Sequence, residues 1–178
     1  MAAVVEGAVG TSLWSVFTAK AELVGAAVMR TTSQETVAML LREATTDFAC
    51  TARVKRRFPK LARRATRRAA KTAKPAPAAE VVALAEFAVA ETGSIALDEP
   101  AADRGACFLA ERLWVLVAER EIVPTLDVGL QRMRDLVRAG ARHPLLMTGP
   151  SRTADIERVL TIGVHGPKAL MIIVVGEA

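Results

Sequence analysis

Apolar residues along this chain fall into short runs that charged or glycine-containing stretches separate. Residues 113–118 form a continuous apolar run between charged neighbours, a pattern typical of a parallel strand covered on both faces. Residues 169–175 repeat the pattern and predict a final buried strand. Shorter strands are predicted at residues 26–29, 94–97 and 145–148.

Other stretches show helical spacing. Residues 12–25 predict a helix with Leu13, Phe17 and Leu23 on one side and Gly25 at its end. Residues 125–139 predict an amphipathic helix, because apolar side chains recur there at steps of three or four.

Three further helices are predicted from capping and composition. Thr32 and Glu35 have the spacing of a capping box, so a helix is expected from Thr32 to about residue 44. Residues 80–91 are alanine-rich and apolar on most faces, which predicts a largely buried helix with Gly93 just beyond its end. Residues 153–160 are expected to form a short helix after a loop.

The alternation of strands and helices predicts a doubly wound α/β fold, with a mainly parallel sheet and helices on both faces. The chain has 178 residues, of which 52% are hydrophobic and 24% charged, and this fits a single domain over residues 1–178. Disordered and collagen-like classes are excluded. The longest apolar runs fall far short of the roughly 20 residues that a membrane span needs.

The net charge of +5 comes from one segment. Residues 51–79 carry eleven basic side chains and no acidic one, whereas the rest of the chain carries 13 basic and 19 acidic ones. The segment has a helical cadence through Val54, Phe58 and Leu61, and it ends in a proline-interrupted stretch. We expect a solvated, partly disordered insert. The alternative, binding to nucleic acid or an acidic membrane, is weakened because Phe58 is its one aromatic residue.

Cysteine and histidine content limits the possible metal chemistry. The chain has two cysteines, Cys50 and Cys107, and two histidines, with no Cys-x-x-Cys or His-Glu-x-x-His spacing. We therefore expect no metal site, no disulfide framework and no cofactor. The first residues lack the features of a secretory or transit peptide, so a reducing, cytoplasmic location is expected.

The strongest candidate site is the stretch at residues 149–157, which runs from a predicted strand through a loop into a predicted helix. Free amides and the helix dipole at such a junction favour an anion, and in an open α/β sheet it would lie at the carboxyl end of a strand. The alternative is that Ser151 or Thr153 only caps the helix, while Asp155 and Glu157 complement its dipole.

Two shorter motifs are further candidates. His165 stands in a glycine-bracketed turn at residues 163–168 and could act as an acid, a base or a structural hydrogen-bonder. Glu91 is expected at a helix C-terminus, where the dipole disfavours a carboxylate, so its placement hints at function. No Walker A, Gly-x-Ser-x-Gly or Gly-x-Gly-x-x-Gly sequence occurs, so nucleotide-binding and hydrolase functions lack motif support.

Taken in order, several of these motifs resemble the LUD domain of the lactate-utilisation protein C family. The resemblance covers residues 80–178, and a looser likeness extends to residues 17–30. The motifs that carry it are Glu91-Thr92-Gly93-Ser94-Ile95-Ala96-Leu97, the strand at residues 114–117 with Ile122-Val123-Pro124, residues 149–157 (Gly-Pro-Ser-Arg-Thr-Ala-Asp-Ile-Glu) and Gly163-Val164-His165-Gly166-Pro167.

The resemblance implies the fold of the sugar-phosphate isomerase and coenzyme A transferase superfamily. It also implies a role in oxidising L-lactate to pyruvate alongside iron–sulfur partner proteins. Glu91 and His165 become candidate catalytic residues, Glu91 as a nucleophile by likeness to coenzyme A transferases. The implied ligand-binding rim consists of Thr92, Gly93, Gly149, Pro150, Ser151, Thr153, Asp155, Glu157 and Gly166.

Three functions remain open from the sequence. The first is a component of a lactate-oxidising assembly that binds a small carboxylate or a partner at this rim. The second is an acyl- or phosphate-handling enzyme that uses Glu91 or His165. The third is an anion or nucleic-acid binding module that acts through residues 51–79, which differ from the strand and loop expected of the family. The chain also begins later than family members usually do.

Overall fold

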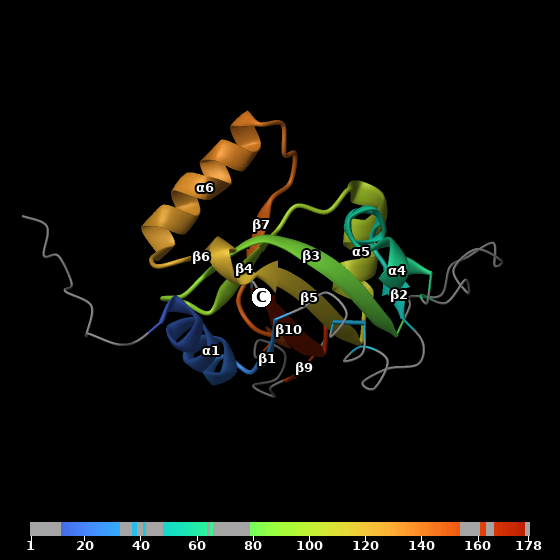
Figure 1. Ribbon diagram of the computed structural model, residues 1–178, viewed down its shortest axis with the longest axis horizontal. Helices are drawn as coiled ribbons and strands as arrows, with labels where there is room; N and C mark the ends of the chain where they lie inside the picture. The colour runs from blue at the N-terminus through green and yellow to red at the C-terminus, as the bar shows by residue number, and fades with distance from the viewer. Residues whose placement is uncertain are drawn as a thin grey trace, which may run out of the picture.

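A mixed sheet of eight strands forms the centre of the molecule (Figure 1). The computed structural model describes residues 12–32, 37–38, 41, 48–63, 65, 79–153, 161–162 and 166–176. The sheet strands are β1 (Ala27–Thr31), β2 (Ala49–Cys50), β3 (Glu80–Val89), β4 (Ser94–Leu97), β5 (Arg112–Ala118), β6 (Ile122–Val123), β7 (Leu145–Met147) and β10 (Ala169–Val175). Two more strands, β8 (Arg152–Thr153) and β9 (Thr161–Ile162), pair with each other.

The main path of the sheet runs β1-β10-β5-β3-β4-β7. The first four of these strands are parallel, and β4 is antiparallel to both of its neighbours. The long strand β3 also pairs in parallel with β2 near its start and with β6 near its end. The predicted α/β class with a mainly parallel sheet is confirmed.

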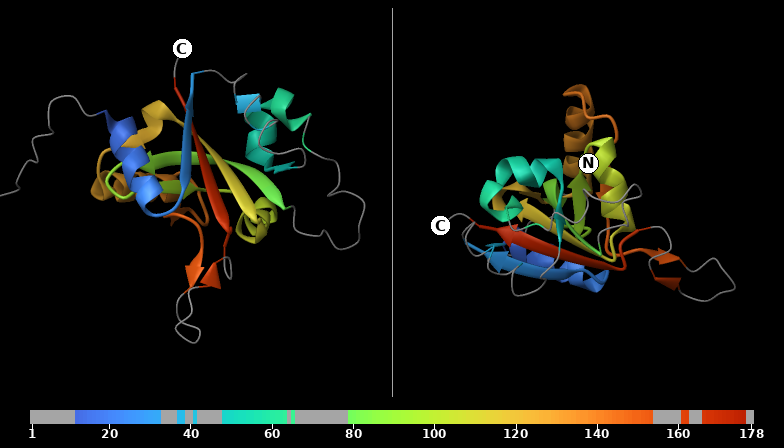
Figure 2. Two further views of the ribbon diagram at one scale, coloured as in Figure 1. Left: turned by 90° about the horizontal axis from the view of Figure 1, so that it is seen from below. Right: turned by 90° about the vertical axis from the view of Figure 1, so that its right-hand side faces the viewer.

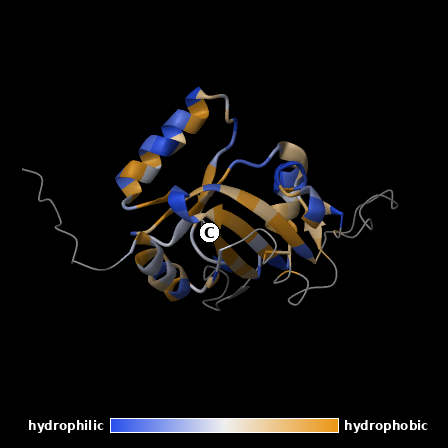
Figure 3. Ribbon diagram, in the orientation of Figure 1, coloured by the Kyte–Doolittle hydropathy of each residue, from blue (hydrophilic) through white to orange (hydrophobic). Residues whose placement is uncertain are grey.

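Helices cover both faces of this sheet, and alternate strand residues point to each. Val81, Leu113 and Ile172 belong to the core beneath α1 (Leu13–Leu23) and α5 (Ala101–Leu109). The opposite core, with Val82 and Trp114, is covered by α3 (Ala52–Arg57) and α4 (Pro59–Ala62). The strands are accordingly apolar along their length (Figure 3), and each fully buried large side chain contributes about 1.5–3 kcal/mol to folding.

A third, smaller core lies under α6 (Leu126–Arg138), the amphipathic helix predicted at residues 125–139. Thr125 caps this helix by accepting a hydrogen bond from the Val128 N–H. Phe87 and Val89 of β3 provide part of the surface on which α6 packs. The predicted helix at residues 12–25 and the strands predicted at residues 26–29, 94–97, 113–118, 145–148 and 169–175 are confirmed as well.

The prediction of a helix at residues 80–91 is wrong, because this stretch forms β3. Its alanines suit a helix, but a strand buried on both faces also shows apolar residues at nearly every position. Pairing with β5 on one side and with β2 and β4 on the other satisfies its backbone groups, and this tertiary pairing overrides helix propensity. Gly93 therefore lies in the turn between β3 and β4.

The predicted helix at residues 153–160 does not begin at Thr153, which pairs with Thr161 in the β8–β9 ribbon. The ribbon projects away from the sheet (Figure 2), and residues 154–160 lie outside the described part of the chain. Of the helix predicted from Thr32, residues 37, 38 and 41 are described, and all three are helical. Helix α5, which the pattern did not predict, contains Gly105 at its centre.

The basic segment is folded in its first part, contrary to the expectation of a solvated insert there. Thr51 caps α3 by accepting a hydrogen bond from the Val54 N–H, and Pro59 stands at the first position of α4. Val54 and Leu61 are fully or nearly fully buried against the sheet. Up to residue 62, the helical spacing of apolar residues therefore arises because α3 and α4 pack on the sheet. Residues 64 and 66–78 lie outside the described ranges.

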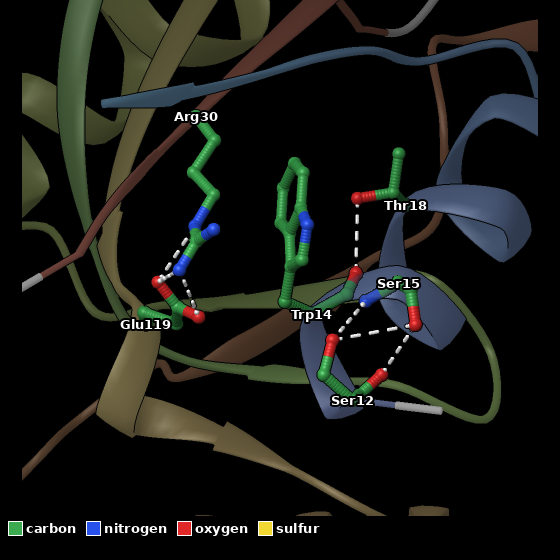
Figure 4. A network of polar contacts seen from close by, with 6 residues as sticks. All are labelled: Ser12, Trp14, Ser15, Thr18, Arg30 and Glu119. Atoms are coloured by element: carbon green, nitrogen blue, oxygen red, sulfur yellow. Dashed lines mark hydrogen bonds and ion pairs between the residues drawn. The ribbon is translucent and has the colours of Figure 1, made fainter. Parts of the chain in front are cut away.

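A polar network ties α1 to two strands at their carboxyl ends (Figure 4). Arg30 of β1 donates two hydrogen bonds of 2.9 Å to the carboxylate of Glu119, which directly follows β5. The Arg30 guanidinium also lies 5.5 Å from the ring centre of Trp14 in α1. Ser12 caps the same helix by accepting a hydrogen bond from the Ser15 N–H. Since the pair is partly exposed, its contribution to stability is small.

Both cysteines are buried, and we expect them to be unreactive in the native protein. Burial raises the pKa of Cys50 to about 11 and that of Cys107 to about 12, so both thiols are protonated near neutral pH. A thiol reagent such as Ellman's reagent should react slowly at pH 8 and should titrate both cysteines rapidly in denaturant. Rapid reaction of either thiol without denaturant would contradict this burial.

Within the described ranges, no helix combines the length and apolar character that a membrane crossing requires.

Candidate functional site

A cavity of about 630 Å³, here called the first cavity, lies between the C-terminal ends of α1 and α5. Strand β7 and the loop after it form another wall, and Gly166 and Pro167 close one side. Its lining residues Val24, Phe108 and Pro167 each stand just before a parallel strand, β1, β5 and β10 respectively. The cavity therefore opens at the amino ends of these three strands. Residues 149–151 lie just after β7, so this motif lies at the carboxyl end of a strand, as the sequence predicts.

The described parts of the sequence motifs at residues 149–157 and 163–168 meet in the first cavity. Gly149, Pro150 and Ser151 line it together with Gly166. The Ser151 N–H donates a hydrogen bond of 3.0 Å to the Pro167 carbonyl. A Cβ atom on Gly166 would stand 3.0 Å from the Ser151 Cβ, so the two segments are in close contact. Segments about fifteen residues apart thus build one rim.

Two motif glycines pack directly on α1 and on the turn that follows it. Gly93 has a φ of +66°, and an added Cβ would overlap the backbone of Lys20 and Ala21. Gly149 has a φ of +73°, and an added Cβ would collide with the Val24 carbonyl oxygen. Both positions need left-handed backbone and a missing side chain, which explains why glycine stands there.

A chain of hydroxyl groups leads from the β3–β4 turn to the first cavity. Thr92 Oγ1 lies 2.7 Å from Ser94 Oγ, which lies 2.7 Å from Thr148 Oγ1. Ser94 is buried, and Thr148 lines the cavity. Ser94 and Thr148 were not predicted as site residues, although each directly adjoins a glycine that was. The chain holds the Thr148 hydroxyl at the cavity wall.

Arg152 places a positive charge at the same cavity. It is exposed and lines the first cavity, and an added Cβ on Gly25 would overlap its guanidinium group. Gly25, at the end of α1 with a φ of +90°, therefore gives the Arg152 side chain its space. An arginine beside hydroxyl groups suits a ligand that carries a carboxylate.

Glu91 has a structural partner that explains its position. The expected place at a helix C-terminus is wrong, since Glu91 lies in the turn after β3. Its carboxylate accepts a hydrogen bond of 2.7 Å from the Leu126 N–H, at the first residue of α6. There the helix dipole favours a negative charge. The argument that Glu91 opposes a helix dipole and is therefore functional no longer holds. Glu91 is also not among the residues that line the first cavity.

Other selected residues receive less support. Asp155, Glu157 and His165 lie outside the described residues, so their roles stay predictions. Thr153 belongs to β8, where it pairs with Thr161. The expected helix therefore does not begin at Thr153. The described polar side chains of the first cavity come from the loop after β7 and from Arg152 of β8.

A second cavity of about 490 Å³ lies at the opposite end of the parallel strands. Residues 118, 175 and 176 bring the carboxyl ends of β5 and β10 to it, and α3 adds Arg53 and Arg57. The sequence singled out these arginines only as members of a basic segment. Their meeting with β5 and β10 depends on strand order, which a local pattern does not show.

A buried carboxyl group lies beneath the start of α3. Glu99 is 5% exposed, and its Oε1 accepts hydrogen bonds from the Thr51 hydroxyl at 3.0 Å and the Leu84 N–H at 3.2 Å. Its Oε2 has no partner among the described residues. Burial raises the pKa of Glu99, while the Leu84 and Thr51 hydrogen bonds and the Arg53 charge act in the opposite direction.

Comparison with known proteins identifies the family. The family model described as "LUD domain" matches residues 49–175. The chain belongs to the LUD domain family. The family match includes every strand of the sheet except β1. It also includes the residues that line the first cavity, apart from Leu23 and Val24.

Curated proteins similar to this LUD domain chain include lactate utilization protein C of Deinococcus radiodurans, 40% identical over 92 residues. The Escherichia coli protein YkgG is 34% identical over 99 residues, and lactate utilization protein C of Geobacillus thermodenitrificans is 33% identical over 100 residues. These alignments cover 50%, 52% and 54% of this chain, respectively, and 42% of each relative. The matched region thus spans less than half the length of these relatives.

A solved structure shares the fold. The crystal structure of a DUF162 family protein from Deinococcus radiodurans superposes with a TM-score of 0.62 at 23% sequence identity. The match covers 92% of this chain and 96% of the other. The α/β architecture of this LUD domain therefore also occurs in an experimental structure.

Proposed function

We propose that this LUD domain protein is a component of L-lactate utilisation and that its first cavity binds a small carboxylate such as lactate or pyruvate. The observation that carries the proposal is the meeting of the Gly149-Pro150-Ser151 and Gly166-Pro167 segments around one cavity. The names of two of the similar proteins, lactate utilization protein C, supply the pathway.

The chemistry of the cavity wall fits such a ligand. The Arg152 guanidinium would pair with the carboxylate, because charge-assisted hydrogen bonds of this kind are short and strong. The hydroxyls of Thr148 and Ser151 would reach the 2-hydroxyl or 2-keto oxygen. Leu145, Met147 and other apolar side chains leave space for a methyl group. The volume lies within the range of small-molecule sites and exceeds that of lactate.

We further propose that iron–sulfur partner proteins take up the electrons of the reaction. Oxidation of lactate to pyruvate removes two electrons and two protons from the hydroxyl-bearing carbon and its oxygen. In this assignment the described cavity binds and orients the carboxylate, and the electrons pass to the partners. His165, whose position is not described, remains a candidate for proton transfer at the same rim.

The Arg152→Gln variant tests the binding proposal. Loss of the charge-assisted pair should weaken binding of L-lactate or pyruvate about tenfold or more, measured by isothermal titration calorimetry. The matched control is Arg138→Gln on α6, where the side chain is 71% exposed and is not part of the cavity lining. The control should bind like the wild type. Equal binding by both variants would remove Arg152 from the site.

A reconstituted assay tests the pathway. The protein is combined with candidate iron–sulfur partners, and lactate-dependent reduction of an electron acceptor is measured with wild type, Ser151→Ala and Arg138→Gln. Activity that requires Ser151 but tolerates Arg138→Gln would support the proposed role. Absence of activity from the complete wild-type set, with every protein folded, would contradict it.

A further inference from the structure

We propose that the second cavity is a separate binding site for an organic anion, one that carries a carboxylate or phosphate on an apolar body. The site lies at the carboxyl ends of β5 and β10 and includes Thr32, just beyond the carboxyl end of β1. In open α/β sheets the crevice outside the carboxyl ends of parallel strands is the common place for ligands.

The charges of the cavity leave Arg57 available for an anion. Glu86 is paired with Arg53 at 2.6 Å, and Glu121 is paired with Arg132 at 2.8 Å. These pairs engage both carboxylates of the lining. Among the described residues, no carboxylate forms an ion pair with Arg57. Its positive charge is thus not balanced by any carboxylate in the described part of the chain.

The position of Arg57 is supported by the residues around it. Its guanidinium lies 5.5 Å from the ring centre of Phe58, which also lines the cavity. Arg53, on the same helix, is held by Glu86 and by the carbonyls of Leu84 and Asp98. Helix α3 is therefore anchored to the sheet, so Arg57 projects from a fixed base.

The floor of the cavity favours a ligand with an apolar part. Leu84, Leu116 and Val175 from three neighbouring strands line it, together with the Phe58 ring. Leu116 is fully buried, but a bare inorganic anion would leave the partly exposed Phe58, Leu84 and Val175 side chains in contact with water, whereas an apolar body would cover them. An organic anion can pair its charged group with Arg57 and cover the apolar side chains with its apolar body.

The second cavity is distinct from the first. The first opens at the amino ends of β1, β5 and β10, and the second at the carboxyl ends of β5 and β10. Strand β5 has seven residues, so the two openings are separated by about 20 Å along it. No lining residue is shared between the two cavities. A ligand in one can therefore be tested without disturbing the other.

Phenyl phosphate is a suitable probe, compared with inorganic phosphate, phenol and benzoate by isothermal titration calorimetry. We expect phenyl phosphate or benzoate to bind more tightly than inorganic phosphate or phenol, because each joins an anion to a ring. The Arg57→Gln variant should weaken this binding about tenfold or more. Preference between phenyl phosphate and benzoate identifies the anionic group.

Two control variants test whether the binding depends on Arg57 itself and on the second cavity. Arg56→Gln makes the same charge change on the neighbouring exposed residue of α3, outside the cavity lining, and should leave binding within about twofold. Arg152→Gln, at the first cavity, should leave the binding of phenyl phosphate to the second cavity unchanged. Equal loss in Arg56→Gln and Arg57→Gln, loss only in Arg152→Gln, or no binding of either ring-bearing anion would overturn the proposal.

Discussion

Replacement of Gly93 by alanine is expected to destabilise the protein by about 2–5 kcal/mol. The left-handed backbone at φ +66° costs an L-residue about 1–2 kcal/mol, and overpacking typically adds about 1–3 kcal/mol. The added Cβ would stand 2.5 Å from the carbonyl carbon of Lys20 and 2.6 Å from the Cα of Ala21. Since these are backbone atoms of α1, no side-chain rotation relieves the clash.

Gly105→Ala is the matched control for Gly93→Ala. Gly105 lies within α5, and an added Cβ would meet no atom within 4 Å. Alanine there should stabilise the protein by about 0.5–1 kcal/mol, because it has the higher helix propensity. Urea unfolding followed by circular dichroism measures both changes. A Gly93→Ala protein as stable as Gly105→Ala would show that α1 does not pack on the β3–β4 turn.

The same contact bears on function, because it joins a motif to a cavity. Gly93 fixes the turn that carries Thr92 and Ser94, and the hydroxyl chain continues from there to Thr148 at the cavity wall. Gly149 makes a second close approach, to Val24. Gly93 and Gly149, which were predicted to bind a ligand, therefore act here by letting two loops approach α1 and the turn after it.

Sequence patterns predicted elements well where one structure alone fits the pattern. The amphipathic stripe of α6 has polar residues on the opposite side, which excludes a buried strand. Strand β3 has no such polar side, because both of its faces are buried. A short apolar run of this kind fits a helix or a central strand equally well, and only the neighbouring strands decide. The error at residues 80–91 arose from this ambiguity.

The residues of the candidate site were likewise predicted only in part. Ser151 and Gly166 were selected from their motifs, and the structure brings them to one cavity. Glu91 was selected because a helix was assumed before it and because of the likeness to coenzyme A transferases. The first ground is wrong, since the turn after β3 directs that carboxylate toward α6. The second cavity could not be predicted, because Arg57 and Val175 are distant in sequence and meet through the order β10-β5-β3.

Glu99 is expected to make the protein less stable as the pH rises from mildly acidic to neutral. Burial raises its pKa above the value of about 4.3 that glutamate has in an unfolded chain. Between these two pKa values the folded protein binds more protons than the unfolded chain, so the free energy of unfolding falls with rising pH. Below the unfolded pKa this penalty is absent, and above the folded pKa it is complete.

The Glu99→Gln variant should remove this pH dependence. Its side-chain carbonyl can still accept the hydrogen bonds from Thr51 and Leu84, but the side chain carries no charge. The difference in unfolding free energy between variant and wild type should therefore shift in favour of the variant from about pH 4.5 upward. Glu111→Gln, at a side chain that is 64% exposed, should show no comparable shift. A constant difference between Glu99→Gln and wild type across this range would contradict a raised pKa.

At mildly acidic pH, where the raised pKa keeps Glu99 more protonated than a glutamate in an unfolded chain, Glu99→Ala should lower stability more than Glu99→Gln does. The change leaves the Leu84 N–H and the Thr51 hydroxyl without their acceptor and opens a void below α3. The expected loss is about 2–4 kcal/mol, from an unsatisfied buried donor and lost packing. Urea unfolding at pH 4.5 measures it beside Glu99→Gln. A loss in Glu99→Ala no greater than that in Glu99→Gln would mean that the Glu99 hydrogen bonds do not hold α3 against β3.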